Sequence, residues 1–373
     1  MTRDPHDLLR VLAQARPDEL DTEVDPATRD AELARAMRGA PAPRRRRRFR
    51  PVWGLAAAAT AVVATAAFVA LPDDPGPPPT ATPSAPERLD AKTVLLAAAN
   101  TVTRDAKPRH LAYWRTSMVH RTAYRVEGGY TFVQDQREDV WTPFDVHRKI
   151  VTETTVLGAR PATPQDEKAW RRAGSPATVR FQTGTRKLKG GTLSTAAKPP
   201  QRSSSPLTDG DKVFWLGRNV SVADLLGLPG DPAKLRASLL RWYDGHGTES
   251  AGTKMASDTW LFTVATALVN GVMPVTPQVR AAAYRMLSAL PSVRSLGAVK
   301  DPAGRPGVAI AFTERTPNGV LEHRLVIDKA TGNALAEVLV IRKPSGVNAV
   351  LPAGTTLSAT TVLTSAWTDA SPR

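Results

Sequence analysis

The chain has 373 residues, enough for one or two domains with substantial hydrophobic cores. It contains no cysteine, which excludes disulfide bonds, thiolate metal sites and a cysteine nucleophile. The formal net charge of +15 does not indicate direct contact with nucleic acid, because residues 1–40 are net acidic, one arginine cluster lies at 44–50, and the remaining excess is spread over residues 91–373.

Residues 1–43 are predicted to form a short helical tail in the cytoplasm. Asp4-Pro5 and Asp25-Pro26 each place a capping residue before a proline, a common start for a helix. Few apolar residues follow, so the tail cannot build a core of its own. It is either a solvated tail or a docking motif that a partner covers.

Residues 44–71 combine an arginine cluster with an apolar run. The run from 52 to 71 has no charged side chain, and as a helix it would span about 30 Å, the thickness of a bilayer's hydrocarbon core. A cleaved signal peptide is the alternative, but its charges would lie at the start of the chain. The positive-inside rule places the N-terminus in the cytoplasm and the C-terminal part outside. The residues that determine this topology are Arg44, Arg45, Arg46, Arg47, Arg48 and Arg50.

Residues 72–88 are rich in proline and favour an extended, semi-rigid stalk. The stalk separates the predicted span from an extracytoplasmic domain over residues 89–373. A basic charge spread over such a domain serves solubility, or attracts anionic envelope polymers or lipid headgroups. The sequence thus predicts a single-pass protein of the cell membrane.

The outer domain begins with a helix that Asp90 caps and that ends near Thr103. Residues 109–157 are rich in aromatic and β-branched residues with turn signals between them, which predicts three or four antiparallel strands. A short helix starts at Thr163-Pro164. Residues 182–211 are polar and basic, and we expect a long flexible loop there.

The rest of the chain alternates between helical and strand patterns. Helices are predicted from Val222, with a restart at Asp231-Pro232, over 257–270, and from Thr276-Pro277. Strands follow over 308–312, 321–327, 335–341 and 355–367, and the last of them is expected to close the sheet. This order indicates an α+β fold with helices packed on an antiparallel sheet, for which an open half-barrel is one available form.

No recognised catalytic motif occurs, so we expect a non-catalytic protein without cofactor or metal. His110 and His120 lack a carboxylate partner for a metal site. The most reactive-looking cluster is 244–247 (Asp-Gly-His-Gly) with Glu249 nearby, for which a helix-ending turn is the favoured interpretation. The acidic pair Glu138-Asp139 is likewise interpreted as part of a turn.

Six aromatic residues are concentrated in the first predicted group of strands. They either pack in the core or line an apolar groove for a lipid, a peptide or a glycan. The candidate groove residues are Tyr113, Trp114, Tyr124, Tyr130, Phe132 and Trp141.

Several long runs carry a family resemblance. They are LGARPATPQDEKAWRRAGSP (157–176), DGDKVFWLGRNVSVADLLGLPGDPAKLRA (209–237), VTPQVRAAAYRMLSALPSVRSLG (275–297), DPAGRPGVAIAFTE (301–314) and LVIDKATGNALAE (325–337). The chain resembles an uncharacterised actinobacterial family of single-pass membrane proteins, often encoded beside extracytoplasmic-function sigma factors. Its element order is also distantly similar to LolA and RseB-like half-barrels, envelope proteins that bind acyl chains or sense envelope damage. Neither resemblance implies an activity.

The leading hypothesis is a membrane-anchored, non-catalytic envelope protein with a sensing or regulatory role. Its tail, residues 1–43, would contact a cytoplasmic partner such as a sigma factor. One departure weakens this hypothesis: a zinc-type anti-sigma domain needs His and Cys ligands, and the tail has no cysteine. The alternatives are an extracytoplasmic carrier or receptor for a lipid, peptide or glycan, and a hydrolase without a recognised motif.

Overall fold

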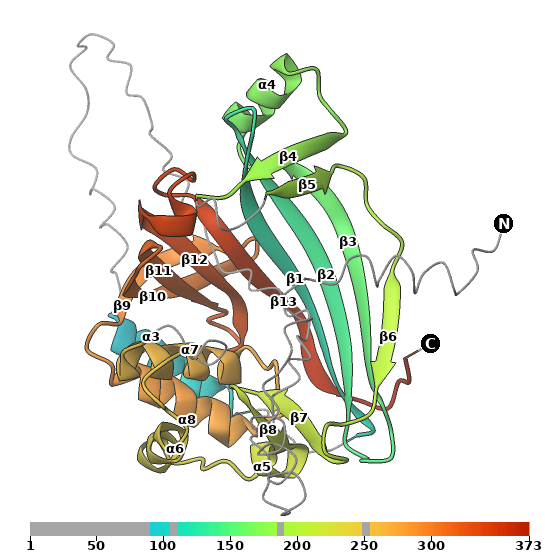
Figure 1. Cartoon of the computed structure of the whole chain (residues 1–373). Helices are drawn as coiled ribbons and strands as arrows, with labels where there is room; N and C mark the ends of the chain where they lie inside the picture. The colour runs from blue at the N-terminus through green and yellow to red at the C-terminus, as the bar shows by residue number, and fades with distance from the viewer. Residues whose placement is uncertain (1–89, 105–110, 185–189, 248–253, 373) are drawn as a thin grey trace, which may run out of the picture. The chain divides into compact units, whose positions relative to one another are not determined.

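The computed structural model describes residues 90–104, 111–184, 190–247 and 254–372 (Figure 1). The predicted tail (1–43), span (44–71) and stalk (72–88) lie outside the described residues, as do all the arginines assigned to membrane topology. Within the described ranges, no helix is both long enough and apolar enough to cross a bilayer. All the described elements belong to the predicted outer domain.

The centre of this domain is an 11-stranded sheet whose strand pairs are all antiparallel (Figure 1). Its main path runs β6-β3-β2-β1-β13-β12-β11-β10-β9, and β4 pairs with β1 and β5 beside that path. The strands are β1 (Tyr113–Val126), β2 (Thr131–Pro143), β3 (Ile150–Pro161), β4 (Thr178–Gln182), β5 (Gly191–Ser194), β6 (Gln201–Ser205), β9 (Arg294–Lys300), β10 (Pro306–Thr316), β11 (Gly319–Ile327), β12 (Ala334–Pro344) and β13 (Thr356–Thr368).

Six α-helices, a short 3-10 helix and a separate β-hairpin complete the described part of the domain. The hairpin consists of β7 (Lys212–Trp215) and β8 (Arg218–Ser221). The helices are α3 (Ala91–Thr101), α4 (Pro164–Arg172), α5 (Val222–Leu226), α6 (Pro232–Leu240), α7 (Ser257–Val269), α8 (Pro277–Ser288) and the 3-10 helix η2 (Gly346–Asn348). The predicted α+β class with an antiparallel sheet is confirmed.

Five of the six described α-helices, all except α7, begin where a local side chain accepts a hydrogen bond from a free backbone N–H group of the first turn. Asp90 accepts a hydrogen bond from Thr93 N at 2.9 Å, and Thr163, Asp231 and Thr276 cap α4, α6 and α8 in the same way. In these last three helices a proline follows the cap directly, where its missing N–H costs nothing. The predicted helix starts are therefore confirmed by hydrogen bonds that are local in the sequence.

One hydrophobic core joins the helices to one face of β10 and β11. Val308, Ile310 and Phe312 of β10 pack with apolar residues of α3, α7 and α8, and Phe262 of α7 stacks on Phe312 with 5.1 Å between ring centres. Figure 1 shows α3, α7 and α8 gathered at this end of the sheet. In the sequence, the apolar residues at i, i+4, i+7, i+8 and i+11 predict the inward side of α8 and the turn after it, and all five are buried: Val279, Ala283, Met286, Leu287 and Leu290. Burial of these apolar side chains is the main force that holds the helices on the sheet.

Alternation along the strands gives the sheet a second, chemically different face. In β11, Leu325 and Ile327 belong to the helix core, so Arg324 and Val326 lie on the opposite face. The register continues that face across the centre of the sheet. We call it the arginine face, and its directly opposed residues from β11 to β2 are Arg324, Val338, Ala359, Arg121 and Asp135.

Three features of the sheet differ from the sequence prediction. The last strand, β13, does not close the sheet but lies at its centre between β1 and β12. The expected loop over 182–211 contains β5 and β6; all residues of β6 are exposed, so this edge strand shows no apolar alternation. Strands β4 and β9 and the β7–β8 hairpin were not predicted, because short or half-exposed strands carry little periodic signal.

The C-terminal end of α7 is fastened to the sheet at Gly271. This residue follows the helix cap Asn270 with φ = 68°, the left-handed conformation typical of helix ends. Its carbonyl accepts hydrogen bonds from Trp114 Nε1 at 2.9 Å and from Ser365 Oγ at 2.7 Å. A Cβ atom at position 271 would collide with the Ser365 hydroxyl. The helix layer is thus joined to β1 and β13 through one glycine carbonyl.

We expect Gly271→Ala to lower the free energy of unfolding by about 1–3 kcal/mol. An alanine is strained at this positive φ, and its Cβ would push the Ser365 hydroxyl away from the carbonyl of residue 271. The measurement is urea unfolding followed by tryptophan fluorescence. Gly174→Ala is the matched control, since Gly174 has φ = 86° but no atom within 4 Å of the point that a Cβ would occupy. Equal losses in the two variants would show that the contact with Ser365 has no effect on stability.

Candidate anion-binding face

The six aromatic residues proposed for a groove do not line one groove. The register of β1 and β2 places Tyr113 and Trp141 on the arginine face, whereas Trp114, Tyr124 and Phe132 lie on the opposite face. Five of the six are buried, with Tyr124 the exception, and Phe132 is 0% exposed. Core packing, the alternative interpretation of these residues, accounts for them because neighbours in a strand point to opposite faces.

The aromatic residues also separate along the strands. Trp114 packs edge-on against Trp367 near the end of α7, with ring centres 5.4 Å apart. At the other end of β1 and β2, Tyr130 and Phe132 belong to a small buried cluster, and Phe132 packs against Trp170 of α4 at 6.1 Å. These residues therefore hold the fold together in two separate places.

The histidines do not form a metal site in the part of the chain that the structure describes, which contains no group of three His, Asp or Glu able to hold an ion. The Nδ1 of His120 lies 3.2 Å from Thr360 Oγ1, and its Nε2 lies 3.6 Å from Glu138. His246 lies beside a turn after α6, with Nδ1 2.8 Å from the carbonyl of Gly247. His110 and Glu249 lie outside the described residues.

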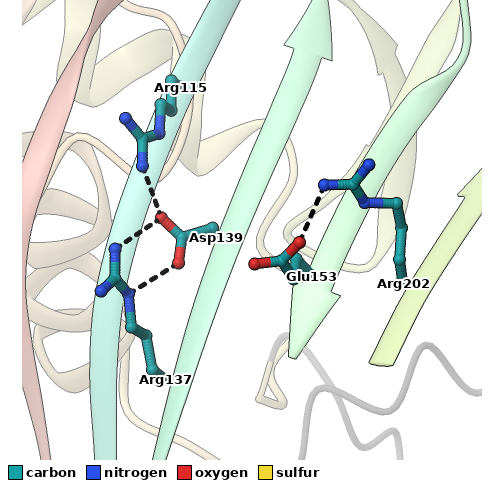
Figure 2. Close-up of polar contacts among 5 residues, drawn as sticks. All are labelled: Arg115, Arg137, Asp139, Glu153 and Arg202. Carbon is teal, nitrogen blue, oxygen red and sulfur yellow. Dashed lines mark hydrogen bonds and ion pairs between the residues drawn. The ribbon is translucent and has the colours of Figure 1, made fainter. Parts of the chain in front are cut away.

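The arginine face carries the densest charge chemistry described in the domain. Asp139, in the middle of β2 rather than in a turn, accepts hydrogen bonds from Arg115 Nη2 at 2.9 Å and from Arg137 Nε at 2.7 Å. Beside it, Arg202 of β6 donates to Glu153 of β3 at 2.8 Å (Figure 2). Asp139 and Glu153 are directly opposed in the register, so the arginines offset a repulsion between two like charges.

Two further carboxylates on this face are also shared between arginines. Asp135 binds Arg121 through two hydrogen bonds, at 2.7 and 2.9 Å, and Arg160 at 3.2 Å. The Glu322 side chain is 0% exposed and forms ion pairs with three guanidinium groups. These belong to Arg294 of β9, Arg324 of β11 and Arg342 of β12.

The arginines keep these carboxylates ionised. Burial by itself would raise the pKa of Glu322, but the hydrogen bonds and charges of Arg324 and Arg342 outweigh it and hold the pKa below its ordinary value. The same balance, burial opposed by arginine hydrogen bonds, lowers the pKa of Asp135 and of Asp139. All three side chains are therefore anionic at neutral pH.

Positive charge is nevertheless in excess on this face. Its four carboxylates, Asp135, Asp139, Glu153 and Glu322, are shared among eight arginines: Arg115, Arg121, Arg137, Arg160, Arg202, Arg294, Arg324 and Arg342. A guanidinium offers five N–H donors in a planar fork that matches carboxylate and phosphate oxygens, and it does not lose its proton at neutral pH. The arrangement is therefore suited to binding an anion rather than to proton transfer.

Sequence reasoning missed this face, although a signal was present. Arg115, Arg121, Asp135, Arg137 and Asp139 all occupy odd-numbered positions of two predicted strands, so one face of both strands is charged. The remaining partners come from β3, β6, β9, β11 and β12, and their contribution depends on strand pairing that the sequence does not state.

The fold and the site define an α+β domain with an ion-paired, arginine-rich sheet face. No protein-family model matches the chain, and no curated protein matches it. Among solved structures it is similar to the complex structure of Pseudomonas aeruginosa MucA/MucB, with 12% sequence identity and a TM-score of 0.23. The match covers 73% of this chain and 55% of the other, so the chain spans about half of that neighbour's length. A TM-score this low carries no argument about function.

Proposed function

We propose that this protein is a non-catalytic, membrane-anchored receptor of the cell envelope whose outer domain binds an anionic ligand on the arginine face. The observation that carries the proposal is the sharing of three carboxylates on this face, Asp135, Asp139 and Glu322, by two or three guanidinium groups each. Anionic polymers and lipid headgroups of the envelope have the chemistry that such a face attracts. The apolar run within 44–71, with the arginines before it, supports the proposed anchor and orientation.

The ligand-binding half of the proposal is tested with the full chain in a neutral detergent and with poly(glycerol phosphate) as the polyanion. We expect the double variant Arg137→Gln/Arg202→Gln to weaken binding about tenfold, since the two guanidinium groups are partly exposed and each contact contributes on the order of 0.7 kcal/mol. Arg236→Gln/Arg241→Gln removes the same charge from exposed positions in and after α6, and should leave binding within about twofold at physiological salt. Equal weakening in both double variants would mean that only net charge matters, and would contradict a defined binding face.

The regulatory half concerns the tail. We propose that residues 1–43 contact a cytoplasmic partner such as a sigma factor, which the resemblance to a family encoded beside such factors supports. The test is a pull-down in which the full chain, and a variant lacking residues 1–43, are exposed to the sigma factor encoded nearest to the gene. Retention by the full chain alone supports this role, whereas no retention, or equal retention by both, removes it.

A further inference from the structure

The arginine face is hollowed near its centre. A pocket of about 200 Å³ opens between β1 on one side and β9 to β11 on the other. Two arginines that belong to the ion-pair network line it, Arg121 of β1 and Arg324 of β11, together with Lys300 of β9. Its apolar lining includes Ala309, Val326, Val338 and Ala359.

The hollow follows from the register of the sheet. Arg121 is directly opposed to Ala359, Ala359 to Val338, and Val338 to Arg324. Neighbouring strands are about 4.8 Å apart, so the backbones of the two arginines are separated by roughly 14 Å, with only short side chains between them. Two long cationic side chains thus flank a shallow apolar floor.

The cationic groups of the pocket retain free donors. Arg121 uses Nε and Nη2 to bind Asp135, so its Nη1 has no hydrogen bond with the described residues. Arg324 uses Nε to bind Glu322, and both of its terminal nitrogens remain. The register pairs Lys300 with Pro306 of β10, so by strand alternation its side chain lies on the helix-core face of β9 with Val308, and not on the arginine face. Two guanidinium groups can therefore donate to one ligand.

The pocket also has one carboxylate, Asp301, that is already occupied by donors, and one hydroxyl, Thr356, that has no hydrogen-bond partner. Asp301 also lines the pocket, but its buried carboxylate is occupied by Arg305 Nε at 2.7 Å and by the backbone N–H groups of Ala303 and Arg305. Thr356, which is 5% exposed, has an Oγ1 atom without a hydrogen-bond partner. A buried hydroxyl without a partner is uncommon in native proteins and is a site where a ligand atom can be accommodated.

We propose that this pocket binds a phosphate group, an inference that rests on the proposed function of the arginine face and specifies its ligand. Two guanidinium groups and a hydroxyl match the three terminal oxygens of a phosphate ester better than the two oxygens of a carboxylate. The apolar floor accepts the first carbon atoms of the ester. The phosphate belongs either to a lipid headgroup or to a soluble or polymer-borne ester of the envelope.

The test is isothermal titration calorimetry of the full chain in a neutral detergent, with glycerol 3-phosphate as the probe. We expect saturable binding at one site, and a loss of about tenfold in affinity in Arg121→Gln and in Thr356→Val, each of which removes a donor; Asp135 keeps its pair with Arg160 in the first variant. Lys329→Gln, at an exposed turn, removes the same charge elsewhere and should bind as the parent does. Thr356→Ser, which keeps the hydroxyl, should restore affinity and separates ligand contact from a packing defect.

Three results would overturn the inference: no saturable binding, equal affinity in Thr356→Val and the parent, or glycolate binding as tightly as glycerol 3-phosphate. If poly(glycerol phosphate) still binds through Arg137 and Arg202 while the small ester does not, the pocket assignment fails and the proposed function stands. If neither poly(glycerol phosphate) nor glycerol 3-phosphate binds, both the proposed function and the pocket assignment are contradicted. The source of the phosphate is tested by titrating the soluble ester into the protein in nanodiscs of phosphatidylglycerol or of phosphatidylcholine. Weaker binding in phosphatidylglycerol means that the lipid headgroup competes for the pocket and is the source. Equal affinity in both identifies a soluble or polymer-borne ester.

Discussion

Glu322→Gln is expected to lower the free energy of unfolding by about 3–5 kcal/mol, because it removes the only anion on which three guanidinium groups converge among the described residues. Because the side chain of Glu322 is 0% exposed, water cannot take the place of the carboxylate as the shared partner of these guanidinium groups. The measurement is urea unfolding at pH 7. Glu153→Gln is the matched control; Glu153 pairs with Arg202 and is 30% exposed, so its loss should cost about 0.2–1 kcal/mol.

The same substitution changes the pH dependence of stability. The pKa of Glu322 is lower in the folded state than its ordinary value of 4.5, so its contribution is present above pH 4.5 and is lost as the pH falls through the folded-state pKa. The parent should therefore lose stability in acid more steeply than Glu322→Gln does. Asp135 and Asp139 have lowered pKa values in both proteins, so part of the acid sensitivity remains. Parallel pH profiles would contradict the role assigned to Glu322.

Arg305→Gln is expected to cost about 3–5 kcal/mol, since it leaves the carboxylate of Asp301 buried without a counter-charge. Arg305 also donates from Nη2 to the carbonyls of Leu335 and Val362, each at 2.9 Å, and thereby binds the segment before β10 to β12 and β13. Urea unfolding again measures the loss. Arg148→Gln breaks a pair with Asp145 in which both side chains are about half exposed, and should change stability by less than about 0.5 kcal/mol.

A double-mutant cycle separates the charge effect from the other contacts of Arg305. Asp301→Asn/Arg305→Gln leaves no uncompensated charge, so its loss should be clearly smaller than the sum of the two single losses. Additive losses would show that the carboxylate and the guanidinium do not stabilise each other.

The arginine face combines a structural and a binding role in the same side chains. Arg324 cannot be removed without disturbing the buried Glu322, whereas Arg202 is more exposed and holds no buried carboxylate. Substitution of Arg202 therefore reports on ligand binding, and substitutions of Glu322 and Arg305 report on stability.

The sequence by itself determined the features whose causes are local. Asp90, Thr163, Asp231 and Thr276 fix helix starts through hydrogen bonds to residues three positions away, and these bonds occur in the structure. The inward residues of α8 follow from helical periodicity. The alternation of strands and helices was sufficient to predict the α+β class. The membrane span, the stalk and the tail remain predictions from the sequence.

Only the tertiary structure decided which strands are neighbours and therefore where the candidate site lies. Periodicity assigns a residue to a face of its strand, but it does not say which distant strand pairs beside it. Arg121 and Arg324 flank one pocket because β13, the last strand of the chain, lies between β1 and β12 rather than at an edge. The aromatic residues divide between two faces because neighbours in a strand point to opposite sides, whereas the charges of distant strands come together through the cross-strand register of the sheet.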